Sequence, residues 1–266
     1  MILSSHSYYS FRYGVIPVET LVKQAVSKGH KSLCLTDINN TTGVIEFVTA
    51  CQKNGIKPIA GIEFRNRDEW KYTGIALNNE GFHLLNNFFS KYNLNNMPFP
   101  DDPADIRNVV FIHPLGGKSI EEMRQHEYAG VQLNQINTLF TENYEHHTPK
   151  YIYFNPVSFI QPEEWEIHKH LRAIDHNILL AHLNENMLAR QDEQLYSPEE
   201  IQKQCERFPF LFDNAWNLSG HCHLEIDSSV KNKKAFTEGP EADQQYLRKL
   251  AMGGIEKRYG TNQPEI

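Results

Sequence analysis

The segment 55–64 reads G-I-K-P-I-A-G-I-E-F, and two shorter motifs precede it, S-S-H-S-Y-Y-S at 4–10 and L-T-D-I-N-N at 35–40. Each motif places a potential metal ligand, His6, Asp37 or Glu63, at or just after an apolar run typical of a β-strand. Barrel-type α/β folds build their active sites from side chains at the C-terminal ends of successive parallel strands. The three motifs therefore predict a polar site at one end of such a fold.

Helical patterns separate the three motifs. Residues 17–29 carry an apolar stripe at helical spacing, with Pro17 at the start and Gly29 at the end, and residues 43–54 carry a similar stripe that ends before Gly55. Proline suits a first helical turn, and glycine suits the position after a last one. With strands at 32–36 and 57–64, the order is that of strands joined by helices.

The alternation continues less regularly to about residue 160. We expect strands at 72–77, 109–113, 130–133 and 151–154, and helices at 82–92 and 119–126. Beyond Pro162 the patterns are helical, with a capping box that begins at Ser197 and a further helix over 238–259. The sequence thus predicts an α/β barrel over residues 1–160 and a helical extension over 161–266.

Composition narrows the class of protein. The 266 residues carry a net charge of −7, and Lys and Arg are scattered apart from a short cluster at 231–234. Proteins that bind nucleic acid on their own usually show a basic stripe, so we expect DNA contact only through a larger assembly. The four widely spaced cysteines, the absence of a signal-peptide pattern and the absence of a long apolar run predict a cytoplasmic protein without membrane contact.

The three motifs, in this order and spacing, resemble the PHP (polymerase and histidinol phosphatase) domain of the bacterial DNA polymerase III alpha subunit, a C-family replicative polymerase. The family pattern is H-x-H-S followed by a Tyr-Ser pair, then L-T-D-H, then G-I-K-P-I-x-G-x-E. The resemblance extends to 155–174, to Y-S-P-E-E-I at 196–201 and to Y-L-R-K-L-A-M-G-G-I-E-K-R-Y-G at 246–260. It implies a distorted (β/α)7 PHP barrel with a helical extension, as an N-terminal fragment of a longer polymerase.

The resemblance also implies a metal site that has lost part of its ligand set. Active PHP domains hold up to three divalent metals, which activate water for phosphoester cleavage. The ligand positions that match the family are His6, Asp37 and Glu63, and we expect them to be vestigial. The positions where a family ligand is replaced are Ser4, Ile38, Pro156 and Ser158. An aliphatic side chain such as Ile38 has no lone pair to give to a cation.

We therefore expect a non-catalytic PHP domain, with no catalytic residues, no cofactor and a structural or partner-binding role in DNA replication. The expected partners are the polymerase core of the same chain, a proofreading exonuclease subunit and other replisome proteins, with DNA reached through the full polymerase. The alternative is an active metal-dependent phosphoesterase or 3′–5′ exonuclease that keeps one divalent ion (Zn, Mn or Mg). A stand-alone histidinol-phosphatase-like protein is a third possibility, which the resemblance of the C-terminal part disfavours.

Four other features are weaker candidates. His113 lies one residue from a family ligand position, and a one-residue shift turns a strand side chain to the other face. His221 and His223 flank Cys222, but no second pair of ligands lies at metal-binding spacing. Glu225 and Asp227 are interpreted as a solvated acidic pair. The aromatic run, which is more typical of packing at a barrel rim than of base stacking, consists of Tyr8, Tyr9, Phe11 and Tyr13.

Overall fold

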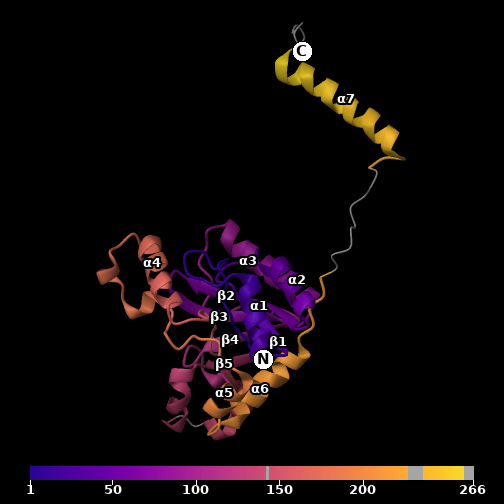
Figure 1. The fold of residues 1–266 in the computed structure, drawn as a ribbon. Helices are drawn as coiled ribbons and strands as arrows, with labels where there is room; N and C mark the ends of the chain where they lie inside the picture. Colours follow the sequence, from indigo (N-terminus) through magenta and orange to yellow (C-terminus); the bar gives the residue numbers. More distant parts are fainter. Residues whose placement is uncertain (142–143, 227–235, 261–266) are drawn as a thin grey trace. The chain divides into compact units, whose positions relative to one another are not determined.

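The computed structural model describes residues 1–141, 144–226 and 236–260. The chain divides into two units, Met1–Ile226 and Asp227–Ile266. The first unit contains the sheet and most of the helices (Figure 1). In the second, the described structure consists of α7 (Pro240–Tyr259), close to the helix predicted over 238–259. The predicted domain boundary near residue 160 stays a prediction, and α4, α5 and α6 belong to the first unit.

A six-stranded sheet forms the centre of the first unit, with its strands in chain order. The strands are β1 (Ser32–Leu35), β2 (Lys57–Asn66), β3 (Glu69–Ala76), β4 (Val109–Pro114), β5 (Glu127–Val131) and β6 (Tyr151–Tyr153). Strand β1 pairs with β2 in parallel, β3 runs antiparallel to both β2 and β4, and β4, β5 and β6 are parallel. The predicted strand at 72–77 is therefore present as β3, in a hairpin with β2, because two residues join them and leave no room for a crossover helix.

The N-terminal segment 2–6 joins the two edges of this sheet. On one side it pairs with β1 and the residue that follows it: Cys34 N–H donates to the Ile2 carbonyl at 2.9 Å, and Thr36 N–H to the Ser5 carbonyl at 3.0 Å. On the other side, His6 N–H donates to the Val157 carbonyl at 2.9 Å. The segment thus acts as a short seventh strand that closes the sheet into a ring. The predicted fold class, a distorted PHP-type barrel with helices after it, is confirmed.

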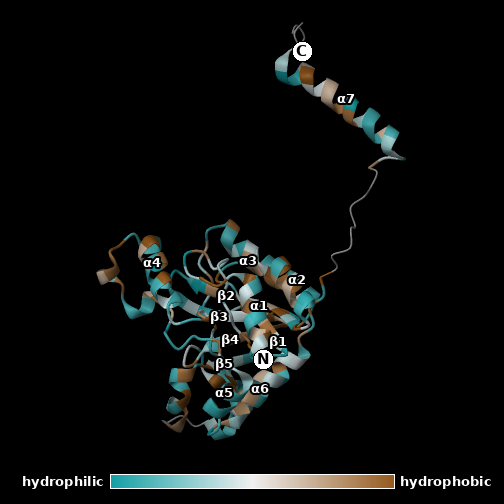
Figure 2. Ribbon diagram, in the orientation of Figure 1, coloured by the Kyte–Doolittle hydropathy of each residue, from teal (hydrophilic) through white to brown (hydrophobic). Residues whose placement is uncertain are grey.

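Helices pack on the outside of the curled sheet (Figure 1). The α-helices of the first unit are α1 (Val18–Ser27), α2 (Val44–Asn54), α3 (Asn79–Leu94), α4 (Glu164–His176), α5 (Pro198–Gln204) and α6 (Pro209–His221). Single turns or short stretches of 3₁₀-helix are η1 (Ile120–Glu122), η2 (Leu133–Thr141), η3 (Tyr144–His146), η4 (Thr148–Lys150), η5 (Leu180–His182) and η6 (Glu185–Met187). Helices α1 and α2 bury apolar side chains against β1 and β2, α3 packs on β3, and α6 packs on β6. The helices show both brown and teal residues, as expected for amphipathic elements with one face on the core (Figure 2).

Local sequence signals account for the helix ends. Gly55 takes a left-handed backbone conformation (φ +67°) after α2, which a glycine adopts without strain. The predicted capping box is present, because the Ser197 hydroxyl accepts from Glu200 N–H while the Glu200 carboxylate accepts from Ser197 N–H. The helix predicted at 119–126 is reduced to the 3₁₀ turn η1, since the chain becomes extended at Met123, whose side chain enters the core.

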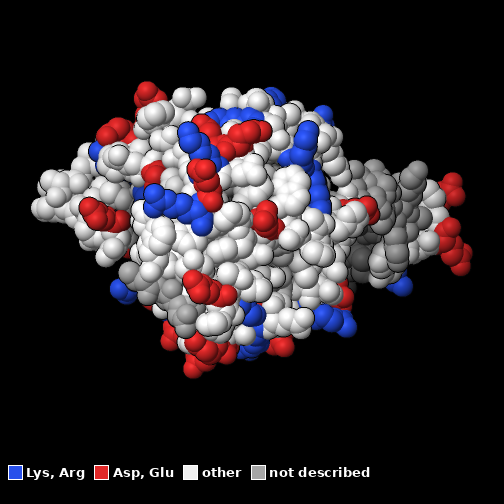
Figure 3. Space-filling view, turned by 90° about the horizontal axis from the view of Figure 1, so that it is seen from below, with Lys and Arg blue, Asp and Glu red and all other residues white. Residues whose placement is uncertain are grey.

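No helix in the described part of the chain is long and apolar enough to span a bilayer. On the face shown in Figure 3, acidic and basic side chains lie interspersed rather than in a basic stripe.

Candidate functional site

The three predicted ligand positions converge at one end of the barrel. His6 is the last residue of the closing segment 2–6, Asp37 follows β1, and Glu63 lies within β2. All three are buried, with at most 1% of each residue exposed. Backbone pairing aligns the two strands here, because Ile38 bridges Glu63 and Asn39 N–H donates to the Glu63 carbonyl at 2.9 Å. The structure thus brings the three predicted positions to the same end of the barrel, and their side-chain contacts describe the arrangement there.

The Glu63 carboxylate lies between a histidine and an arginine. Its Oε2 is 3.1 Å from His6 Nε2, and its Oε1 accepts from Arg65 Nε at 2.6 Å. Burial alone would raise the pKa of Glu63, but the positive charge of Arg65 and the contact with His6 lower that pKa to about 2. Glu63 is thus an ionised, buried carboxylate whose two oxygens both have partners.

His6 has acceptors at both ring nitrogens. Nδ1 lies 2.9 Å from the Ser158 hydroxyl, which donates its own proton to Glu193 Oε2 at 2.6 Å. Nε2 faces the ionised Glu63. Both ring nitrogens of His6 therefore already have hydrogen-bond partners within the protein. Ser158, which stands where the family has a histidine, therefore belongs to this hydrogen-bond network.

Asp37 organises the loop that follows His6. Its Oδ1 accepts from Ser7 N–H and from the Ser10 hydroxyl, both at 2.7 Å, and its Oδ2 accepts from the Ser7 hydroxyl at 2.8 Å. Burial raises the pKa of Asp37, against the opposing effect of these hydrogen bonds. With three donors already on its oxygens, Asp37 acts as the centre of a turn at 7–10.

Arg65 is one residue of this site that the motifs did not identify. Its side chain is 12% exposed, and besides Glu63 it donates from Nη2 to the Tyr13 hydroxyl at 3.2 Å, with the guanidinium carbon 4.6 Å from the centre of the Tyr13 ring. Although burial favours the neutral form, Glu63 raises the pKa of Arg65 above its usual range, so the guanidinium is cationic. The signal was the spacing Glu63-x-Arg65, because alternate residues of a strand share a face.

These contacts do not fit a divalent metal. Such an ion needs several lone pairs converging on one point. Here both oxygens of Glu63, both nitrogens of His6 and both oxygens of Asp37 have other hydrogen-bond partners. In the part of the chain that the structure describes, no group of three or more His, Cys, Asp and Glu side chains is placed to hold a metal. We derive no metal-dependent step for this arrangement.

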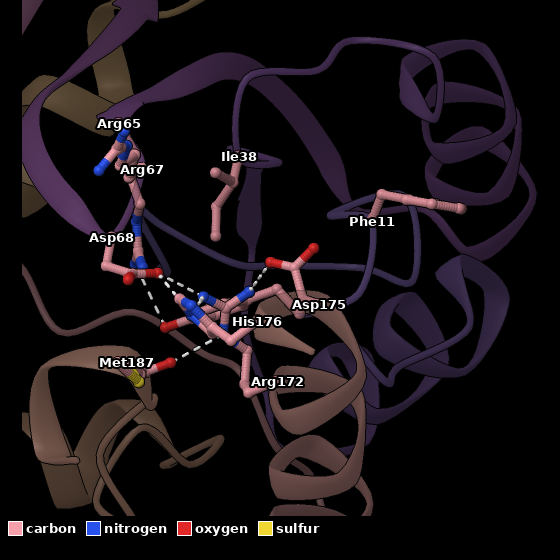
Figure 4. Close-up of a pocket in the computed structure, with 10 residues that line it drawn as sticks. Phe11, Ile38, Arg65, Arg67, Asp68, Arg172, Asp175, His176 and Met187 are labelled. Atoms are coloured by element: carbon pink, nitrogen blue, oxygen red, sulfur yellow. Dashed lines mark hydrogen bonds and ion pairs between the residues drawn. The ribbon is translucent and has the colours of Figure 1, made fainter. Parts of the chain in front are cut away.

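A cavity of about 600 Å³ opens beside the cluster (Figure 4). Ile38 points into it, with Arg65 and Arg67 on one side, and Phe11 points away (Figure 4). The lining residues are Phe11, Tyr13, Ile38, Arg65, Arg67, Asp68, Arg172, Asp175, His176 and Met187. An apolar side chain therefore fills the place where the family pattern has a histidine.

The opposite wall of the cavity comes from the helical extension. Arg172 of α4 donates to Asp175 Oδ2 and to the Met187 carbonyl, each at 2.7 Å, and it also pairs with Asp68 (Figure 4). Since Asp68 lies in the turn between β2 and β3, this cluster fastens the extension to the barrel. The cavity is thus enclosed by residues of both parts.

The weaker candidates lie apart from this cluster. His113 is buried beside Glu127, 3.5 Å from its Oε1, and burial lowers the pKa of His113. Lys118 and Arg124 hold the Glu127 carboxylate at 2.8 Å each, which marks a buried ion-pair group between β4 and β5. His113 contacts this group rather than the ligand positions, so the described contacts give it no part in the site.

The remaining predicted features have ordinary surroundings. His223 is exposed and bonds Glu225 at 3.0 Å, and His221 bonds the Asn217 carbonyl of its own helix. Of the aromatic run, Tyr13 is buried and Phe11 is 78% exposed. Asp227 and the cluster at 231–234 lie outside the described residues.

Comparison with known proteins gives the class. Residues 3–128 match the PHP domain family, so this part of the chain is a PHP domain.

Over nearly its whole length the chain is also similar to DNA polymerase III subunit alpha. It is 26% identical to that protein of Buchnera aphidicola subsp. Acyrthosiphon pisum, in an alignment that covers 99% of this chain and 26% of the relative. Against the same protein of Mycoplasma genitalium it is 23% identical, over 98% of this chain and 30% of the relative. Against that of Escherichia coli (strain K12) it is 26% identical, over 96% of this chain and 25% of the relative. The chain thus spans between a quarter and three tenths of the length of these curated relatives.

Proposed function

We propose that this chain acts in DNA replication as the PHP domain of a DNA polymerase III alpha-type polymerase, and that it is a non-catalytic, structural domain with a degenerate metal site. The observation that carries the proposal is the Glu63–Arg65 pair, 2.6 Å apart within a buried cluster. A carboxylate held by a guanidinium is not free to bind a catalytic metal, and without metal the chain offers no activated water for phosphoester cleavage.

The partners that we propose are the polymerase core of the same chain, a proofreading exonuclease subunit and other replisome proteins. Similarity to DNA polymerase III subunit alpha over 96–99% of the chain supports this assignment. DNA would be reached through the full polymerase, because the net charge is −7 and the face in Figure 3 has no basic stripe.

One observation favours the alternative, a metal-dependent phosphoesterase or 3′–5′ exonuclease with a single Zn²⁺, Mn²⁺ or Mg²⁺. His6 and Glu63 lie side by side at 3.1 Å, as two ligands of one ion would, and Asp37 is buried on the neighbouring strand. Binding would require the ion to displace Arg65 from Glu63.

Metal content and hydrolysis, measured together, decide between the two. The purified chain is incubated with Mn²⁺ or Zn²⁺, dialysed, analysed for bound metal and assayed on a phosphomonoester and on single-stranded DNA. We expect no retained metal and no turnover. Stoichiometric metal together with turnover that Glu63→Ala or Asp37→Ala abolishes would establish the enzyme instead.

A further inference from the structure

We propose that Arg65 is a resident cation of the barrel: its guanidinium supplies to Glu63 the positive charge that a divalent metal would otherwise supply, and it transmits that contact to the helical extension through Tyr13. This inference rests on the proposed non-catalytic function. It assigns to one residue of this chain both the loss of metal affinity and the stability of the site.

The buried Glu63 carboxylate needs a compensating positive charge. Glu63 is 1% exposed, and its carboxylate accepts from Arg65 Nε at 2.6 Å. A carboxylate is removed from water at a large cost unless a cation and hydrogen bonds compensate it. Arg65 meets this need from within the same strand. A guanidinium is charged at any physiological pH and its planar array of donors fits a carboxylate, so no ion from solution is required.

The guanidinium of Arg65 occupies the position that a metal on Glu63 would need. It lies against Glu63 and Tyr13 and lines the same cavity as Ile38. A metal bound to Glu63 Oε1 would have to occupy the space in which Arg65 Nε now lies. Ile38 offers no metal ligand that would compensate for displacing Arg65 from Glu63. The Arg65 guanidinium and the absence of a ligand at position 38 therefore both disfavour metal binding at Glu63.

Tyr13 connects Arg65 to α4. Arg65 and Arg172 both lie against the ring of Tyr13, at 4.6 and 5.3 Å from its centre. The Tyr13 carbonyl accepts from His168 Nδ1 at 2.7 Å, and His168 and Arg172 both belong to α4. Because Tyr13 bridges the two arginines, loss of Arg65 should loosen the extension as well as the barrel end.

The experiment uses the full chain and a matched pair of variants. Arg65→Met removes the charge at similar length. Arg67→Met does the same two residues away, at an exposed side chain for which the described structure shows no hydrogen bond or ion pair. The double variant Glu63→Gln/Arg65→Met removes both charges, and Arg65→Lys keeps the charge without the planar donors. Thermal unfolding is recorded with EDTA, with Mn²⁺ and with Zn²⁺, and hydrogen exchange is followed over α4.

We expect the wild-type melting temperature to be the same with EDTA and with either metal. Arg65→Met should lower it by roughly 10 °C, because it leaves a buried carboxylate unpaired, and should speed exchange in α4. Arg67→Met should do neither. The double variant should be more stable than Arg65→Met alone, and Arg65→Lys should be intermediate. If Arg65→Met does not fold, the last two variants still provide the comparison.

The outcomes separate the two proposals. Wild-type protein that retains stoichiometric metal and turns over substrate would overturn both. Metal-free, inactive wild type with an Arg65→Met variant as stable as Arg67→Met, or with a double variant no more stable than Arg65→Met, would overturn the role of Arg65 and leave the non-catalytic function standing.

Discussion

The ring of His168 makes a hydrogen bond at each of its two nitrogens with the backbone, and the shorter of the two is to Tyr13. Its Nδ1 donates to the Tyr13 carbonyl at 2.7 Å, and its Nε2 accepts from Ala189 N–H at 2.9 Å. The neutral tautomer with the proton on Nδ1 satisfies both contacts, whereas a second proton would set two N–H groups against each other. Burial accordingly lowers the pKa of His168 from its ordinary 6.5 to about 4.

Stability should therefore fall in mild acid. The unfolded chain takes up the His168 proton near pH 6.5 and the folded chain near pH 4, so stability is fully present above pH 6.5 and is lost as the pH falls toward 4. The shift corresponds to about 3 kcal/mol. Urea unfolding of wild type and His168→Gln between pH 7 and 4 checks this, and the variant should show the weaker pH dependence. Burial also lowers the pKa of His30 to about 4, so His30 should contribute to the loss of stability with falling pH in both proteins. Equal slopes in the two proteins would contradict the assignment.

The arginine that fastens α4 should be costly to remove. Arg172 is 5% exposed and pairs with Asp68, Asp175 and a backbone carbonyl. Arg172→Met should lower the unfolding free energy by about 3 kcal/mol, because Asp68, Asp175 and the Met187 carbonyl each lose a hydrogen-bond donor. Lys169→Met on the same helix, which removes an ion pair with the exposed Glu166 and a contact with the Trp165 ring, should cost less, about 1 kcal/mol. Similar losses in the two variants would show that Arg172 makes no special connection.

Gly14 should not tolerate a side chain. A Cβ at this position would lie 1.8 Å from the Ser7 carbonyl oxygen, within the loop that Asp37 holds, and a backbone atom cannot move aside cheaply. Gly14→Ala should cost more than about 3 kcal/mol, measured by urea unfolding. Gly220→Ala is the control, because a Cβ there meets nothing within 4 Å and the helix should gain up to about 1 kcal/mol. A Gly14→Ala variant as stable as wild type would mean that the loop has another conformation.

The four thiols should be inert in the folded protein. Cys34, Cys51, Cys205 and Cys222 are buried, and burial raises the pKa of each of them. The thiolate is the reactive form, so a thiol reagent should modify them at least roughly 100-fold more slowly than in the urea-unfolded chain. Mass spectrometry of the labelled protein identifies any exception, and a cysteine labelled within minutes would show that its surroundings open readily.

The sequence predicted the parts of the fold that depend on local periodicity. The helices α1, α2 and α3 and the strands β1, β2 and β4 lie within a few residues of their expected positions. The direction of β3 was not predictable, because alternation of apolar residues is the same in parallel and antiparallel strands. The closing role of segment 2–6 also depends on partners that are distant in the chain, and no local signal marks it.

The sequence motifs name three candidate residues but not the side chains that contact them. The three motifs located His6, Asp37 and Glu63, and the structure brings the first and last into direct contact. The partners that decide their chemistry are Arg65, Ser158 and Glu193, which enter through hydrogen bonds that a motif does not encode. Of these, Arg65 could have been found from its spacing to Glu63, whereas Glu193 comes from a loop whose approach to the barrel depends on the packing of α4.

The closing segment sets an order of events during synthesis on the ribosome. His6 and Ser158, which bond each other, are separated by 152 residues, and the same stretch of chain pairs Ser4 and His6 with Val157. Strands β1 and β2 with helices α1 and α2 can assemble from neighbouring residues, but the ring cannot close until the chain has been translated past Val157. Until then the edge of segment 2–6 that pairs with Val157 has no partner, and it is an exposed strand edge of the kind that nascent-chain chaperones protect from aggregation.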